Sequence, residues 1–343
     1  MPQQRFLKAG IKVSLLVILC ISCSSCAKAQ TDGNRNFNLW LENIRAEALA
    51  RGISQDTVNK ALRNVNPMRR VLKRDRNQSE FKLTLARYKK RVITPQNIKT
   101  GRKKSLNHAD LFNHIEKRYG VQRRFILAIW GIETRFGQVK ADLPVIPAVA
   151  TLAFDRRRSN YFKAQIFAVL RMLENGYVSQ KQLRGSWAGA MGQPQFMPSS
   201  YLAYAVDFDG DGRRDIWKNT GDVLASIANY LAKHGWNNNL TWGREVILSS
   251  VAKKSIGALS TRAAPGCRAL TSKRKFISIW QKHGVRRIDG SSLSTKKIKG
   301  AIVFPDGKIG KIYLVYKNYS SIMSYNCAHL YGITVGLFSD LLG

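Results

Sequence analysis

Glu133 lies on the apolar face of a predicted helix. Residues 124–137 read RFILAIWGIETRFG, and Ile126, Ile129, Trp130 and Glu133 are spaced at i, i+3, i+4 and i+7. Apolar and aromatic surroundings disfavour the charged form of a carboxyl and raise its pKa, a property that a general acid needs near neutral pH. The alternative is a structural glutamate paired with a buried arginine.

A second segment has the composition of a sugar-binding groove. Residues 185–201 read GSWAGAMGQPQFMPSSY. The small residues let the backbone approach a ligand closely, and the glutamine amides and aromatic faces are groups that a sugar chain uses. Core packing would account for Met191, Phe196 and Met197, but not for glycines beside glutamines.

The acidic loop at residues 206–217 resembles a calcium-binding loop. Asp207, Asp209 and Asp211 alternate, Gly212 follows, and Asp215 is ninth, as in the EF-hand pattern. The twelfth position holds Lys218 instead of a bidentate glutamate. We predict a structural Ca²⁺ with the Arg213 carbonyl as a further ligand; neutralisation by arginines is the alternative.

The elements that position these segments are mainly helical. Residues 37–125 are expected to be helical apart from a loop at 99–105, with amphipathic stretches at 37–49 and 81–92. Residues 121–235 are again mostly helical and include a helix at 222–233. After Trp242, strands are predicted at 245–249, 301–304 and 309–316, the last two joined by a Pro-Asp-Gly turn. A final helix is expected at 322–342.

The first 29 residues have the features of a secretory signal peptide. Three basic residues precede an apolar run at 13–23, and Ala-Lys-Ala follows at 27–29. The run is shorter than the roughly 20 residues needed to cross a bilayer. A buried helix is one alternative, and a lipid anchor on Cys20, Cys23 or Cys26 is the other, although none has the Leu-x-small-Cys context.

Charge and cysteine content restrict the partners. The net charge is +36, and removal of the four basic residues of the leader lowers it to +32. Such a charge indicates a polyanionic partner, which for an exported protein is the anionic cell wall or a membrane surface. Cys267 and Cys327 remain after cleavage, and whether they pair is left open.

Together the E-T-R-F-G segment, the GSWAGAMG and QFMPSSY segments and the D-x-D-x-D-G loop resemble the membrane-bound lytic murein transglycosylase B family, from residue 37 to the C-terminus. The resemblance implies an α+β, mainly α fold with a goose-type lysozyme-like core. Residues 30–240 would form this core and an additional helical lobe, 241–320 a small β-rich lobe, and 321–343 a C-terminal helix that returns to the core.

The resemblance also implies an activity: cleavage of peptidoglycan between N-acetylmuramic acid and N-acetylglucosamine without water, leaving 1,6-anhydromuramic ends. Glu133 matches the family's single acid and base. Ordinary glycosidases use two carboxylates about 5–5.5 Å or 6.5–9.5 Å apart, and the sequence has no second acid in an obvious motif near Glu133. No cofactor is expected for catalysis.

Further site residues follow from the resemblance. Ser186 matches a serine that steers the substrate's N-acetyl group, and Asp222 would close the calcium cage, with a favourable charge at a helix N-terminus as its alternative role. Arg157 and Arg158 would hold the carboxylates of peptide stems, unless they form a solvated charged face. The predicted sugar contacts are Gln195, Phe196, Tyr230, Tyr325, Asn326, Tyr331 and Tyr88, although Tyr230 also fits a core position.

Two other classes of function do not fit the sequence. A non-catalytic wall-binding protein would lose the acid, yet Glu133 is present. A nucleic-acid-binding protein needs neither an export signal nor the segment at 185–201. We therefore expect a periplasmic, monomeric lytic transglycosylase that binds peptidoglycan strands and no nucleic acid. Complexes with other envelope proteins stay open.

Overall fold

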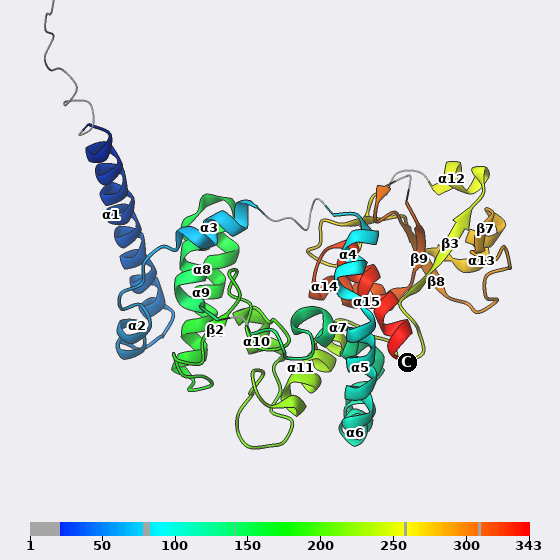
Figure 1. Ribbon diagram of the computed structural model, residues 1–343, viewed down its shortest axis with the longest axis horizontal. Helices are drawn as coiled ribbons and strands as arrows, with labels where there is room; N and C mark the ends of the chain where they lie inside the picture. Colours follow the sequence, from blue (N-terminus) through cyan, green and yellow to red (C-terminus); the bar gives the residue numbers. More distant parts are fainter. Residues whose placement is uncertain (1–20, 78–82, 141, 257–258, 308–309) are drawn as a thin grey trace, which may run out of the picture.

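The computed structural model describes residues 21–77, 83–140, 142–256, 259–307 and 310–343 (Figure 1). The signal-peptide prediction lies mostly outside these residues. The first described helix, α1, runs over Ile21–Ala50. Within the described residues, no helix combines the length and apolar character that a membrane crossing requires.

In one helical lobe, on the left of Figure 1, α1 and the two helices that follow it pack against helices from later in the chain. Phe37, Val58, Val149 and Leu170 are buried in its core. The cap of α2 is local: the Ser54 side chain accepts a hydrogen bond from the Thr57 amide. Besides α1, the lobe contains α2 (Gln55–Ala61), α3 (Arg69–Arg76), α8 (Val145–Phe154), the 3₁₀ turn Arg156–Arg158, α9 (Ser159–Glu174) and α10 (Pro198–Tyr204).

A second group of helices surrounds α7, the helix that carries Glu133. α7 packs against α5, α11 and α15. Ile126, Ile129 and Trp130 are buried as their spacing predicts, but so is every residue from Phe125 to Gly131, so this part of α7 is buried on all sides and not on one face alone. The helices of this group are α4 (Leu85–Val92), α5 (Pro95–Asn107), α6 (Ala109–Tyr119), α7 (Arg123–Thr134), α11 (Thr220–Lys233), α14 (Lys317–Tyr325) and α15 (His329–Leu342).

The loop expected at residues 99–105 is wrong, because this stretch lies inside α5. Gly101 does not form a turn; its lack of a side chain allows neighbouring helices to pack closely. A Cβ placed on it would come within 2.6 Å of Leu342 Cδ2 and 3.0 Å of Phe136 Cζ. The glycine therefore lets α5 approach α15 and the end of α7.

The single helix expected at 322–342 is instead two helices, α14 and α15. Asn326 has φ −144° and ψ 116°, an extended conformation that ends α14. The chain thereby leaves the helical path at Cys327, which forms a disulfide with Cys267 across a Cα–Cα distance of 5.4 Å. The pairing that the sequence left open is thus formed.

The β-rich lobe lies between α11 and α14, at the right of Figure 1. Its antiparallel sheet has the order β6-β8-β9-β3-β7. The predicted hairpin is confirmed, since Ala301 of β8 pairs with Val315 of β9. The lobe comprises β3 (Gly243–Leu248), α12 (Ser250–Ile256), β4 (Thr261–Arg262), β5 (Leu270–Thr271), β6 (Lys275–Phe276), α13 (Ile277–Lys282), β7 (Val285–Arg287), β8 (Lys299–Val303) and β9 (Ile312–Val315).

The disulfide should contribute substantially to stability. Its sequence separation is 60 residues, and closing such a loop stabilises the folded state by about 4 kcal/mol in the chain-entropy model. We expect the paired variant Cys267→Ser/Cys327→Ser to lose up to this amount, as measured by denaturant unfolding. The oxidised and chemically reduced protein should differ in the same way; equal unfolding free energies would contradict the assignment.

Candidate active site

Glu133 lies at the C-terminal end of α7, half-buried, and Tyr331 from α15 donates a hydrogen bond to it. The distance from Tyr331 Oη to Glu133 Oε1 is 2.7 Å. Tyr331 is 2% exposed. The packing of α15 on α7 thus fixes one oxygen of the candidate acid with a buried hydroxyl.

The tyrosine hydroxyls beside Glu133 stay protonated. Burial raises the pKa of Tyr331 well above its ordinary value, and the charge of Glu133 adds to the shift. The pKa of Tyr325 is raised for the same two reasons. An electrostatic interaction with Tyr88, on the α4 helix that packs against α15, makes a smaller contribution to the raised Tyr331 pKa. Tyr325 and Tyr331 therefore lie in the electrostatic surroundings of Glu133, and Tyr88 lies close enough to interact with Tyr331.

An aromatic cluster continues from Tyr331. The ring of Tyr325 is stacked with that of Tyr331 at 6.4 Å between centroids. The same ring lies 4.7 Å from that of Tyr230 and 5.8 Å from that of Phe196. Tyr325 Oη donates to the Pro194 carbonyl at 2.6 Å. The side chains that the sequence placed in a cleft are thus brought together.

Two members of this cluster are more buried than a sugar platform would be. Phe196 is 2% exposed and Tyr230 is 7% exposed, and both belong to the core of the helical lobe. Tyr230 Oη donates to the Ser324 carbonyl at 2.6 Å. Tyr230 therefore occupies the core position that its spacing allowed, and both rings support the half-buried Tyr325. Their contact with sugar stays a prediction.

The segment 185–201 forms tight turns. Ser186 Oγ accepts a hydrogen bond from the Ala190 amide at 3.1 Å. Gln195 has φ 54°, and its Nε2 donates to the Gly192 carbonyl at 2.9 Å. Gly192 itself has φ +63°, and an added Cβ would lie 2.6 Å from the Ile216 carbonyl oxygen. Backbone turns therefore position Ser186 and Gln195.

Gln193 has a role that the sequence did not reveal. Its Oε1 accepts a hydrogen bond from Trp130 Nε1 at 2.7 Å, and its Nε2 donates to the Trp217 carbonyl at 2.8 Å. Its own carbonyl accepts from Thr134 Oγ1 at 3.0 Å. The composition of segment 185–201 predicts that the Gln193 amide is available to a sugar, whereas this side chain connects α7, on either side of Glu133, with the end of the acidic loop. Its side-chain partners are 63 and 24 residues away, so no local pattern identifies them.

The two arginines at 157 and 158 share a partner that the sequence did not indicate. Both guanidinium groups form ion pairs with Asp75 of α3, whose side chain is 5% exposed. A buried carboxylate requires such pairing. The arginines therefore tie α3 to the start of α9, while about half of each side chain remains exposed. Binding of stem carboxylates stays a prediction.

The acidic loop gathers three carboxylates. Oxygen atoms of Asp207, Asp209 and Asp211 all lie within 4.8 Å of one another. Throughout the described ranges, no lysine or arginine forms an ion pair with these three groups. Gly210 and Gly212 supply φ values of +79° and +84°. The donor set and its spacing suit an oxygen-preferring divalent cation.

Two other predicted ligands bind backbone amides. Asp222 is fully buried and accepts from the Phe208 and Asp215 amides at 2.8 and 2.6 Å. Burial raises the pKa of Asp222 to about 6. Asp215 Oδ1 accepts from the amides of Trp217 and Lys218, both at 3.0 Å. These contacts shape the loop, and metal coordination by Asp215, Asp222 and the Arg213 carbonyl stays a prediction.

Asn326 is exposed at the break between α14 and α15. It directly follows Tyr325 and directly precedes the disulfide-bonded Cys327. The disulfide therefore anchors the segment that presents Asn326 and Tyr325.

The chain is similar to known proteins over most of its length. Residues 36–340 match the transglycosylase SLT domain family. Over 151 residues the chain is 42% identical to membrane-bound lytic murein transglycosylase B of Escherichia coli K12. This segment covers 44% of the chain and 42% of that relative, so the match spans less than half of the relative's length.

Solved structures show the same fold. SltB3 from Pseudomonas aeruginosa in complex with NAG-anhNAM-pentapeptide is 36% identical, with a TM-score of 0.80, and the match covers 89% of this chain and 79% of that one. The Escherichia coli lytic transglycosylase Slt35 in complex with calcium is 28% identical, with a TM-score of 0.71, and the match covers 90% and 93%. The expected mainly helical, lysozyme-like fold with a small sheet is thus confirmed.

Proposed function

Because this chain belongs to the transglycosylase SLT domain family, we propose that it is a lytic transglycosylase that cleaves peptidoglycan strands with Glu133 as acid and base. The central observation is the hydrogen bond from buried Tyr331 to Glu133, at one end of an aromatic cluster. The similarity to SltB3 bound to a NAG-anhNAM-pentapeptide supports the substrate class. Mass spectrometry of digested sacculi tests the proposal.

The proposed reaction consumes no water. Glu133 gives its proton to the glycosidic oxygen as the bond from that oxygen to C1 of N-acetylmuramic acid breaks. The substrate's N-acetyl group stabilises the positive charge at C1. Glu133, now a carboxylate, takes the proton from the C6 hydroxyl, whose oxygen bonds to C1 and closes the 1,6-anhydro ring. Tyr331 holds one oxygen of Glu133 in place through both steps.

Other side chains would bind and orient the glycan strand. Ser186 and Gln195 are fixed by backbone turns, and Tyr325 lies half-buried beside Tyr331. Amide, hydroxyl and aromatic groups of this kind fix ligand orientation in concave sites. The proposed sugar contacts also include Tyr88, Phe196, Tyr230 and Asn326, and Arg157 and Arg158 would hold stem carboxylates.

A structural calcium ion is the second part of the proposal. Asp207, Asp209 and Asp211 would hold it, completed by the Arg213 carbonyl, Asp215 and Asp222. The convergence of three carboxylates without an arginine or lysine partner in the described part of the chain supports this assignment, as does the calcium complex of Slt35. Gln193 would transmit the order of the loop to α7.

Removal of calcium should lower the melting temperature. An ion present at a hundred times its Kd stabilises the folded state by about 2.7 kcal/mol, which corresponds to roughly 4 °C for a chain of this size. Thermal unfolding in calcium and in excess chelator measures the shift. The Asp207→Asn/Asp211→Asn variant should have the same melting temperature in calcium and in chelator. The control variant Asp56→Asn on α2 should show the same calcium-dependent shift as the parent. If the melting temperature of the parent protein is the same in calcium and in chelator, a bound structural ion is ruled out.

The proposed location is the periplasm, with peptidoglycan as the partner of a monomeric enzyme. The leader features of residues 1–29 and the positive charge support export to an anionic wall. Fractionation of cells that express the full chain tests the location.

A further inference from the structure

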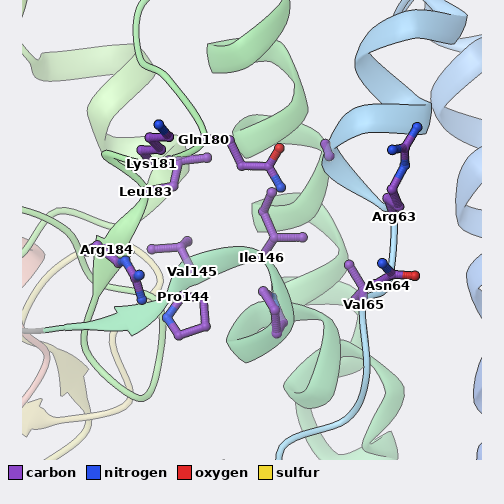
Figure 2. A pocket seen from close by; sticks show the side chains of 12 residues that line it. Arg63, Asn64, Val65, Pro144, Val145, Ile146, Gln180, Lys181, Leu183 and Arg184 are labelled. Atoms are coloured by element: carbon purple, nitrogen blue, oxygen red, sulfur yellow. The ribbon is translucent and has the colours of Figure 1, made fainter.

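A cavity outside the candidate active site lies between the helical lobe and the short strand pair β1 (Leu143–Pro144) and β2 (Arg184–Gly185) (Figure 2). Its volume is about 570 Å³, which is within the range of small-molecule and peptide sites. Three segments line it: the connection from α2 to α3, the start of α8, and residues 180–184. Its floor is apolar and buried, formed by Val65, Val145, Ile146 and Leu183.

The rim of this cavity is cationic. Arg63, Lys181 and Arg184 are exposed at its edge, and no acidic residue is among the lining residues. Within the described residues, Arg63 and Lys181 have no ion-pair partner. Arg184 reaches Asp142 only at 4.0 Å. Exposed cations above an apolar floor suit a ligand that combines carboxylates with small apolar groups.

Residues that line the cavity directly precede the proposed glycan-binding residues in the sequence. Pro144 pairs with Arg184, and Leu143 pairs with Gly185, the residue before Ser186. Ser186 lies two residue steps after Arg184, which in extended chain is a distance of about 7 Å. A five-residue peptide spans at most about 17 Å when extended. A peptide attached to a sugar near Ser186 is therefore long enough to reach the rim.

We propose that this cavity binds the carboxylate-bearing stem peptide of peptidoglycan, as a site separate from the glycan contacts and from Arg157 and Arg158, which do not line it. The inference rests on the proposed function for the identity of the peptide. The alanine methyl groups of a stem would contact the apolar floor, and its carboxylates would pair with Arg63, Lys181 and Arg184. Figure 2 shows the Gln180 side chain above Ile146, so a larger residue at this position would fill the cavity without changing its charge.

Binding of a free stem pentapeptide to the full chain tests the site directly, by calorimetry. Arg63→Gln/Lys181→Gln should weaken the Kd roughly 10-fold, the usual effect of losing a charge-assisted contact. Gln180→Trp should weaken it similarly although it retains every cation. Lys253→Gln/Lys254→Gln on α12, which removes the same charge from exposed positions of the β-rich lobe, should bind as the parent. Equal binding by all four proteins, or no binding by the parent, would overturn the proposal.

Digestion assays separate this inference from the proposed function. The variants of the cavity should lose kcat/KM on peptide-bearing strands and retain it on strands whose peptides have been removed. Failure of the parent to cleave either substrate would refute the proposed activity but leave the peptide-binding result intact. Phosphatidylglycerol vesicles test an anionic lipid as the alternative ligand. If the protein binds the vesicles through Arg63 and Lys181 but does not bind the peptide, the cavity is a lipid site and the proposal is overturned.

Discussion

Replacing Glu133 with glutamine should abolish the release of anhydromuropeptides from purified sacculi. Glutamine has nearly the same shape, and its Oε1 can still accept the hydrogen bond from Tyr331 Oη, so the fold should be retained. It can neither give nor take the proton that each step of the reaction needs. General acid–base catalysis contributes about 10²- to 10⁴-fold, and because Glu133 serves twice we expect a loss of at least about 10³-fold.

The matched control is Glu42→Gln. Glu42 belongs to α1 and its side chain is 70% exposed beside Arg45, so this variant removes one carboxylate without touching the candidate site. It should release muropeptides at the parental rate, and all three proteins should melt at similar temperatures. An E133Q protein that keeps a tenth of the parental rate would refute Glu133 as the acid.

Replacing Tyr331 with phenylalanine should lower kcat by about 10- to 100-fold, because a hydrogen bond to a charged group contributes about 1.5–3 kcal/mol. The donated hydrogen bond favours the ionised form of the Glu133 carboxylate. Its loss makes Glu133 hold its proton more strongly. The alkaline limb of the pH–rate profile, where the acid form of Glu133 is lost, should therefore move to higher pH. Burial and the charge of Glu133 raise the pKa of Tyr331 well above its ordinary value, so its hydroxyl does not titrate in this range.

The pH profile distinguishes a positioning role from a structural one. Tyr313→Phe also removes a hydroxyl from a residue that is only 1% exposed, but in β9 of the β-rich lobe. It should leave the pH–rate profile unchanged. If Y331F lowers the melting temperature and the rate without moving the alkaline limb, Tyr331 is a packing residue and does not act on Glu133.

Local patterns were enough to predict the elements that carry the site. The spacing of Ile126, Ile129 and Trp130 predicted a helix that buries these residues, although α7 is buried all round at 125–131, and the Pro-Asp-Gly turn predicted the β8–β9 hairpin. These signals lie within one turn of a helix or one pair of strands. The acidic loop was likewise visible because its carboxylates alternate over five residues.

Features that depend on distant partners were missed or wrong. The loop predicted at 99–105 was wrong, because Gly101 closely approaches Leu342, a residue near the other end of the chain that no local pattern reveals. The break at Asn326 directly precedes Cys327, whose disulfide partner Cys267 is 60 residues away. Asp75, which pairs with Arg157 and Arg158, lies 82 and 83 residues before them. Such contacts leave no periodic pattern in the sequence.

The same limit applies within the candidate site. Glu133 and Tyr331 are separated by 198 residues, and only the fold brings the hydroxyl to the carboxylate. The family resemblance placed both residues in one cleft but did not indicate which group the hydroxyl contacts. Likewise, the spacing of Tyr230 allowed both a cleft and a core position, and its burial shows that the core position is occupied.

The central claim is that Glu133 closes a 1,6-anhydro ring with no water involved. The most direct test is mass spectrometry of purified sacculi digested by the parental protein in water enriched in ¹⁸O. We predict muropeptides that end in 1,6-anhydromuramic acid and carry no ¹⁸O from cleavage. Reducing muramic ends that contain ¹⁸O would show hydrolysis and contradict the account.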